Sequence, residues 1–253
     1  MMASTAPVRA LVDRVSELCE STFAAVEALR GVAEQLFLPW SGGAPLRRAD
    51  VEPIAAVVRP VLETEGTPLV GAGLVLAPGV LDDARHWMEW WHHGPGGDTS
   101  VRRLHPVLDA AAENFYDYTV LPWFAIPRDT GARHVTGPYV DWLCTEEYTL
   151  TFTAPLFGVH PERGRQYLGV VGADIVNSWV ERRLLPLLHR TGRPAALVNA
   201  EGRVVVANHP ALVTGSVTHR VDVPGLWSGR EADGAALHRV GELPLAVLVL
   251  DAR

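Results

Sequence analysis

Aromatic and acidic side chains gather between residues 116 and 174 of this 253-residue chain. An aromatic run at 116–124 is followed by Tyr-Val-Asp at 139–141 and by an apolar segment that ends at Asp174. Aromatic faces attract cations by about 0.5–2 kcal/mol per contact, and carboxylates form strong hydrogen bonds with charged N–H groups. No nucleophile or metal cluster accompanies these residues. Their types therefore favour a pocket that binds a cationic ligand without transforming it.

Sequence motifs of common enzymes are missing. The chain has no Gly-x-Ser-x-Gly, phosphate-binding loop or His-Glu-x-x-His pattern. The acid pairs Asp82-Asp83 and Glu146-Glu147 are expected to face solvent, because acid–base catalysis needs both groups aimed at one bond. We expect no catalytic residue and no cofactor. A metal-dependent enzyme remains an alternative, which turnover of a tested substrate would establish.

The histidines of residues 86–93 offer the nearest approach to a metal site. This stretch is predicted to be a strand, in which the adjacent His92 and His93 point to opposite faces. His86 and His92 share a face but lie six residues apart, which is too far for easy chelation. We therefore expect no metal site.

Composition places the chain among ordinary folded proteins, with 48% hydrophobic and 20% charged residues. A net charge of −7 repels nucleic acid phosphates, so direct nucleic acid binding is not expected. No apolar run reaches the roughly 18–20 residues of a membrane-spanning helix, and no secretory signal is visible. Cys19 and Cys144 are predicted to be buried thiols in a reducing compartment. These features predict a cytoplasmic protein with no membrane association.

Residues 6–38 are predicted to form one long helix, because apolar positions recur at alternating steps of four and three. The positions are Leu11, Val15, Leu18, Thr22, Ala25, Leu29, Val32 and Leu36. This period fits a helix packed on its own domain and equally a helix that pairs with a second copy of the chain. Both alternatives remain open at the level of sequence.

The remaining elements are predicted from apolar periodicity and from turn residues. A second helix is expected at 50–63 and a third at 175–190. Strands are expected at 69–76, 86–93, 102–104, 148–157, 166–174, 195–199, 203–208 and 245–250. The last 60 residues are too few for a large core of their own, so we expect this unit to lean on the first helix.

This order of elements, together with the central motifs, resembles the double Cache (PDC, PAS-like) sensor domains. The motifs that carry the resemblance are residues 116–124, 137–141, 151–155 and 169–174. The resemblance implies an α+β fold in which a long N-terminal helix precedes two PAS-like lobes with central antiparallel sheets, the second lobe being small. The expected division is 1–40 for the long helix, 41–190 for the ligand-binding lobe with its connecting helix, and 191–253 for the second lobe.

A subset of this family binds amino acids through a recurring pattern. The pattern has an aromatic residue, an Arg two residues before a Trp-aromatic pair, a Tyr-x-Asp sequence and a later Asp. The matching ligand-binding candidates are Tyr116, Trp123, Phe124, Tyr139, Asp141 and Asp174. Leu121 stands where the subset has the Arg that holds the ligand carboxylate. The resemblance therefore implies an amine-type variant, which keeps only the half of the pattern that holds an ammonium group.

We predict a non-catalytic sensor that recognises a cationic amine or amino-acid-like metabolite and takes part in signal transduction. Expected partners are a second copy docked through the first helix, a separate transcription regulator or another signalling protein. The alternative is an interaction or dimerisation module that needs no ligand. Sensors of this family usually lie outside the membrane between two membrane-spanning helices. Without such helices, this chain is expected to be a stand-alone cytoplasmic sensor or a fragment of a larger receptor.

Overall fold

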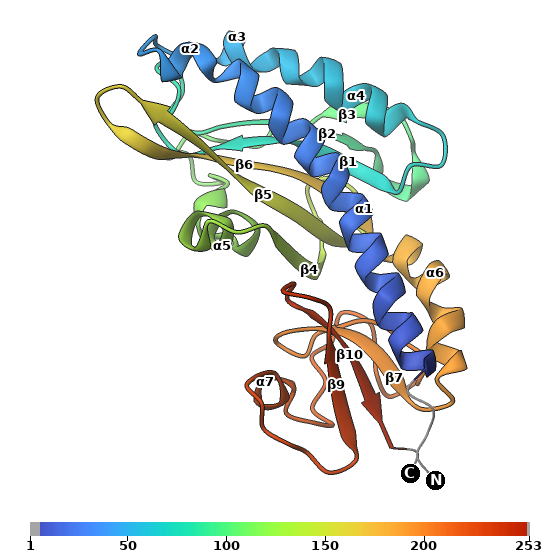
Figure 1. Cartoon of the computed structure of the whole chain (residues 1–253). Helices are drawn as coiled ribbons and strands as arrows, with labels where there is room; N and C mark the ends of the chain where they lie inside the picture. Colours follow the sequence, from blue (N-terminus) through green and yellow to red (C-terminus); the bar gives the residue numbers. More distant parts are fainter. Residues whose placement is uncertain (1–5, 252–253) are drawn as a thin grey trace.

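The computed structural model describes residues 6–251, which form two lobes connected along one side by a long helix (Figure 1). The α-helices are α1 (Ala6–Leu36), α2 (Leu38–Ser41), α3 (Arg48–Val51), α4 (Ala55–Glu63), α5 (Pro122–Thr130), α6 (Asn177–Arg190) and α7 (Val223–Trp227). Short 3-10 helices are η1 (Glu52–Ile54), η2 (Pro95–Gly97) and η3 (Tyr118–Val120). The strands are β1 (Leu69–Leu76), β2 (Trp87–His93), β3 (Val101–Arg103), β4 (His134–Val140), β5 (Tyr148–His160), β6 (Gly164–Val176), β7 (Ala195–Asn199), β8 (Val204–Ala207), β9 (Ala235–Arg239) and β10 (Leu245–Leu250).

The first lobe is built on a six-stranded sheet in the order β3-β2-β1-β6-β5-β4, with every neighbouring pair antiparallel. Helices α1 and α4 cover one face of this sheet, and α5 covers the other (Figure 1). Because side chains alternate along a strand, Leu74 packs with the helices on the first face while Val75 packs near α5 on the second. The central strands, such as β1, are thus buried on both faces, whereas the edge strand β3 is partly exposed. The ligand-site candidates lie on the α5 side.

The second lobe has a four-stranded antiparallel sheet in the order β8-β7-β10-β9. Leu11 and Val15 of α1 share one hydrophobic core with Val205 of β8 and Val247 of β10. The small lobe therefore packs against the first helix, as predicted. The predicted α+β architecture, with a long helix, a larger lobe and a smaller lobe, is confirmed.

The predicted heptad seam of α1 is occupied within the chain itself. Five of its positions are buried, and the other three are partly buried against the same core. The N-terminal half of α1 lies beside α6, and the C-terminal half crosses the first sheet (Figure 1). The period therefore reflects packing on the chain's own lobes.

Prolines account for several of the elements that differ from the prediction, although strand β9, which was not predicted either, contains none. The single helix expected at 50–63 is divided into α3, η1 and α4, with Pro53 inside η1. Helix α5 was not predicted: Pro122 begins it, Pro127 lies within it, and Gly131 ends it with a left-handed φ of 68°. Strand β4 was also not predicted, because Gly137 and Pro138 interrupt its alternation.

Candidate functional site

Asp174 lies near the C-terminal end of β6, paired with Gly71 of β1 and Thr151 of β5. The Thr151 hydroxyl donates to Asp174 Oδ1 at 2.6 Å, and Trp90 Nε1 and Asp174 Oδ2 both lie against the open side of Gly71. A Cβ on Gly71 would stand 2.9 Å from Asp174 Oδ2 and 3.0 Å from Trp90 Nε1. The absence of a side chain at residue 71 therefore gives the buried carboxylate its space.

Asp141 follows β4 directly and is also buried. Its Oδ1 accepts hydrogen bonds from the backbone N–H groups of Leu143 at 3.2 Å and Cys144 at 3.3 Å. Its Oδ2 is buried and accepts no hydrogen bond from any of residues 6–251. An unsatisfied buried carboxylate oxygen is costly, so this atom has the capacity to accept from a ligand.

The two acids oppose one another's ionisation, because their like charges share one buried site. Burial, followed by the charge of Asp141, raises the pKa of Asp174 to about 8. Burial and the same two carboxylates also raise the pKa of the Cys144 thiol and of the Tyr116 phenol. The salt bridges among residues 6–251 involve neither Asp141 nor Asp174, and the chain contains no lysine. The pair is therefore suited to a cation supplied from outside the chain.

An irregularity in β4 places an aromatic ring beside these acids. The β4–β5 register shifts between Thr136 and Tyr139, where Gly137 has a φ of 127° and a Cβ would stand 2.6 Å from the carbonyl oxygen of Thr149. Beyond this bulge, the Tyr139 hydroxyl lies 2.6 Å from Thr151 Oγ1. Since Thr151 also bonds Asp174, the phenol and the carboxylate are joined through one hydroxyl.

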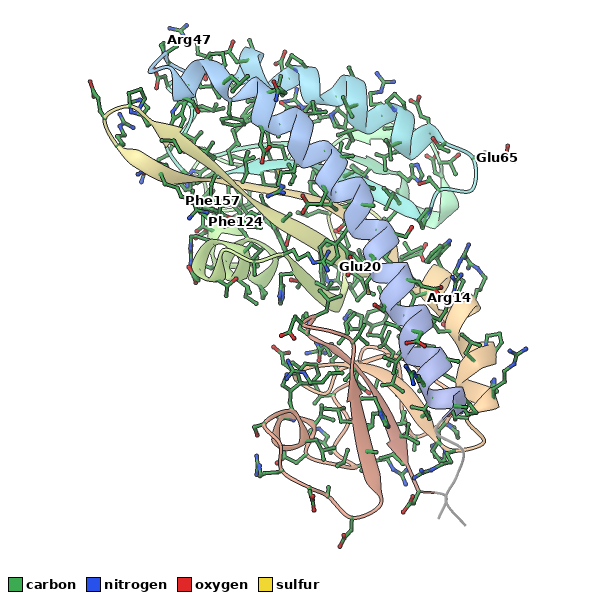
Figure 2. All side chains as sticks on the ribbon, viewed as in Figure 1. Arg14, Glu20, Arg47, Glu65, Phe124 and Phe157 are labelled. Atoms are coloured by element: carbon green, nitrogen blue, oxygen red, sulfur yellow. The ribbon has the colours of Figure 1, made fainter. Side chains whose placement is uncertain are left out.

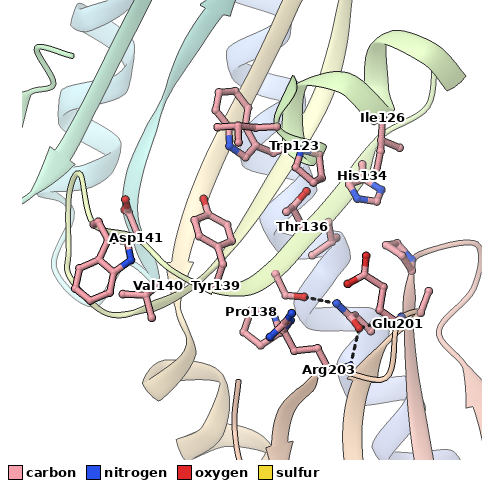
Figure 3. Close-up of a pocket in the computed structure, with 18 of the residues that line it drawn as sticks. Trp123, Ile126, His134, Thr136, Pro138, Tyr139, Val140, Asp141, Glu201 and Arg203 are labelled. Atoms are coloured by element: carbon pink, nitrogen blue, oxygen red, sulfur yellow. Dashed lines mark hydrogen bonds between the residues drawn. The ribbon is translucent and has the colours of Figure 1, made fainter. Parts of the chain in front are cut away.

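Two neighbouring cavities are formed here. The inner cavity, of about 40 Å³, is lined by both acids and by the rings of Tyr116, Trp123 and Tyr139. The outer cavity, of about 570 Å³, lies between α5 and β4 of the first lobe and the β7–β8 hairpin of the second (Figure 3). Aromatic walls and two acids around a small cavity can hold an ammonium group.

The structure brings together five of the seven candidates around the inner cavity, namely Tyr116, Trp123, Tyr139, Asp141 and Asp174. Leu121 lines the outer cavity. Phe124 lines neither cavity: it packs against Tyr118 and Tyr167, with ring centroids 5.2 and 5.5 Å away, on the side of α5 near Phe157 (Figure 2).

Trp90 is a site residue that the sequence did not indicate. It lines the inner cavity together with Asp174. Side chains alternate along β2, so Trp90 and Met88 lie on the same face of the strand. Only the order of strands in the sheet shows that this face is the ligand side. Thr151 belonged to a quoted motif, although its bridging role depends on strand register.

The histidines of β2 contact backbone carbonyl oxygens. His92 Nδ1 lies 2.7 Å from the carbonyl oxygen of His93, and His93 Nε2 lies 3.0 Å from that of Leu62. Within residues 6–251, no three His, Cys, Asp or Glu side chains are grouped to hold a metal ion. Both cysteines are buried and free, and burial raises the pKa of Cys19 to about 12.

Comparison with known proteins identifies the fold. No family model matches the sequence, and the curated proteins contain no match. Among solved structures, a methyl-accepting chemotaxis protein X is 16% identical, with a TM-score of 0.66 over 98% of this chain and 96% of that chain. The periplasmic sensory domain of the Campylobacter jejuni chemoreceptor Tlp1 is 12% identical, with a TM-score of 0.61 over 96% and 91%. The ligand-binding domain of the Pseudomonas aeruginosa amino acid chemoreceptor PctC, in complex with GABA, is 19% identical, with a TM-score of 0.52 over 96% and 95%.

These similarities confirm the predicted resemblance at the level of the fold, which is that of chemoreceptor and histidine-kinase sensor domains of the Cache type. The expected cytoplasmic location is wrong, because the similar domains include the periplasmic one of Tlp1 and extracellular ones of histidine kinases. No helix within residues 6–251 has both the length and the apolar character needed to cross a membrane.

Proposed function

We propose that this chain is a non-catalytic sensor domain that binds a cationic amine between Asp141 and Asp174. The observation that carries the proposal is the buried Asp141 Oδ2, which has no hydrogen-bond partner among residues 6–251 and lies in one cavity with a second buried acid. An ammonium group would donate to this oxygen and favour the ionised form of Asp174, whose pKa is raised to about 8 without a ligand. The rings of Tyr116, Trp123 and Tyr139 would surround the cation.

The fold supports a sensor role, because the similar structures include ligand-binding domains of chemoreceptors. PctC binds GABA, a molecule that carries an ammonium group. For the present chain, Leu121 offers no positive charge to a ligand carboxylate. An α-carboxylate would be held close to two acids and repelled by them. We therefore favour an amine without an α-carboxylate over an amino acid.

Isothermal titration with primary amines and with the matching α-amino acids tests this assignment. We expect amines to bind and Asp141→Asn to weaken them roughly 10- to 100-fold, the usual effect of losing a charged hydrogen-bond partner. Asp82→Asn is the matched control, because Asp82 is exposed and lies outside both cavities. If only the amino acids bind, or if Asp141→Asn binds amines as tightly as the unchanged protein, the assignment is wrong.

We also propose that ligand binding is passed to a partner, either a second copy docked on α1 or a separate transcription regulator or signalling protein. The seam of α1 is buried, so a dimer would use the face of α1 that is exposed. Deleting the helix would remove core from both lobes and so cannot test this idea. Sedimentation of the whole chain, with and without an amine, can do so; a monomer in both conditions would contradict the dimer.

A further inference from the structure

The inner cavity is too small to hold a whole metabolite. Its volume is about 40 Å³, and one water needs about 10–15 Å³ by a comparable measure. An ammonium group and its first carbon fill that space. The outer cavity, at about 570 Å³, is within the range of roughly 300–1,000 Å³ typical of small-molecule sites.

The two cavities are adjacent. Five residues line both of them: Tyr116, Trp123, Tyr139, Asp141 and Leu143. Asp141 thus belongs to the acid pair and also to the boundary of the larger space. If the ammonium group of a ligand binds at the acid pair, the rest of the ligand can extend into the outer cavity.

The first lobe gives the outer cavity a largely apolar wall. The apolar lining from this lobe includes Leu121, Ile126, Val135, Pro138 and Val140, and Pro244 of the second lobe adds to it. His134 also lines it, and burial lowers the pKa of this imidazole to about 4, so it carries no charge at neutral pH. Apart from Asp141 at the boundary, Glu201 and Arg203 of the second lobe are the charged side chains in the lining. This wall fits an apolar chain or ring.

The second lobe closes the cavity through the hairpin between β7 and β8. Asn199 Nδ2 donates to the carbonyl oxygen of Gly137 at 3.0 Å and fixes the hairpin against β4. Arg203 Nη1 donates to the carbonyl oxygen of Gly215 at 2.7 Å within its own lobe. Figure 3 shows Glu201 and Arg203 across the cavity from the side chains of α5 and β4. A ligand in this space therefore contacts both lobes.

From this geometry we infer that the ligand is an elongated primary amine whose apolar body occupies the cavity between the two lobes. The inference rests on the proposed amine function and adds the class of ligand and its contact with the second lobe. The ammonium head lies between Asp141 and Asp174, and the body leaves the inner cavity past Tyr139 and Trp123. The second lobe thus becomes part of the binding site.

Calorimetric titration of the full chain with methylamine, propylamine, hexylamine and phenethylamine tests the inference. Each methylene that enters the outer cavity is expected to raise affinity about 4-fold, because burying it contributes about 0.8 kcal/mol. Hexylamine should therefore bind far more tightly than methylamine. Affinity that does not change with chain length would overturn the inference.

Two variants locate the ligand body. Ala200→Trp fills the outer cavity from the second lobe, and Ile126→Trp fills it from the first; both residues line it. Each is expected to weaken hexylamine at least tenfold and to leave methylamine unchanged. Ala211→Trp is the control, because Ala211 is exposed in the second lobe and lines neither cavity. Because the two tryptophans are introduced from different lobes, the test still works if one of these two variants does not fold.

The outcomes separate this inference from the function on which it rests. If short and long amines bind equally, or if the two tryptophan variants leave hexylamine unaffected, the amine site stands and its extension is wrong. If no amine binds the unchanged chain, both fail together. Loss of hexylamine alone in the two variants supports the extension.

Discussion

Asp174 makes the stability of the folded chain depend on pH. Its pKa is about 8 in the folded protein and about 3.9 in an unfolded chain. Between these pH values the folded state binds more protons than the unfolded state, so the contribution to stability is complete below about pH 4 and is lost as pH rises to about 8. One proton gives a slope of at most about 1.4 kcal/mol per pH unit.

We therefore predict that Asp174→Asn flattens the pH dependence of unfolding between pH 5 and 8, because the amide does not titrate. Urea denaturation at several pH values measures this, with Asp82→Asn as the control that keeps the original slope. Amine binding should be lost in the same variant. A slope equal to that of the unchanged protein would show that Asp174 does not titrate in this range.

Leu121→Arg is predicted to add affinity for α-amino acids. The residue lines the outer cavity next to Trp123, so a guanidinium group there can pair with a ligand carboxylate. One charge-assisted interaction is worth about 1.5–3 kcal/mol, or roughly 10- to 100-fold in affinity. Titration with an amino acid and its decarboxylated amine measures the change, and Leu121→Met should bind as the original does. If Leu121→Arg gains no affinity for amino acids, residue 121 does not decide between amines and amino acids.

The resemblance to the family pattern, which rests on the order and spacing of rings and acids, indicated most of the residues that line the inner cavity. It could not separate Trp123 from Phe124. These neighbours stand about 100° apart around helix α5, so one lines the cavity while the other packs on Tyr118 and Tyr167. Without the helix, which two prolines concealed, both rings were assigned to the ligand.

At the scale of the elements, strand β1 leaves space for the Asp174 carboxylate because it has a glycine at residue 71. Gly71→Ala is predicted to weaken amine binding at least tenfold, because its Cβ would press on Asp174 Oδ2 and Trp90 Nε1. Gly31→Ala is the control: nothing lies within 4 Å of its Cβ, and helix α1 should gain up to about 1 kcal/mol. Calorimetry and urea denaturation measure the two effects. Unchanged amine affinity in Gly71→Ala would mean that Asp174 can move without loss.

Strands with continuous apolar character, such as β1 and β6, were predictable because burial on both faces leaves a plain signal. Strand β4 was not, since its bulge at Gly137 breaks the period that identifies a strand. The same bulge places Tyr139 beside Thr151. The irregularity that concealed the element is thus the one that shapes the site.

For the whole molecule, α1 shows what a sequence period leaves undetermined. A seam with heptad spacing can be buried by a second chain or by the chain's own sheets, since either partner offers an apolar surface. Only the arrangement of the two lobes decides between them. Here Leu11 and Val15 meet the second lobe, and Phe23 meets the first at Phe152, with ring centroids 5.1 Å apart.

The lobes are also joined where β6 leads into α6. Asn177 is buried there, and its Nδ2 donates to the carbonyl oxygen of Val205 at 2.7 Å. We predict that Asn177→Ala lowers the free energy of unfolding by about 0.5–1.5 kcal/mol, because the Val205 carbonyl loses one of its two donors and keeps the Thr214 hydroxyl at 3.3 Å. Urea denaturation followed by both fluorescence and circular dichroism measures the change. The unfolding curves from fluorescence and circular dichroism should still coincide in this variant, because α1 continues to link both lobes in one core. If the two curves separate, Asn177 contributes more than α1 to the joint unfolding of the lobes.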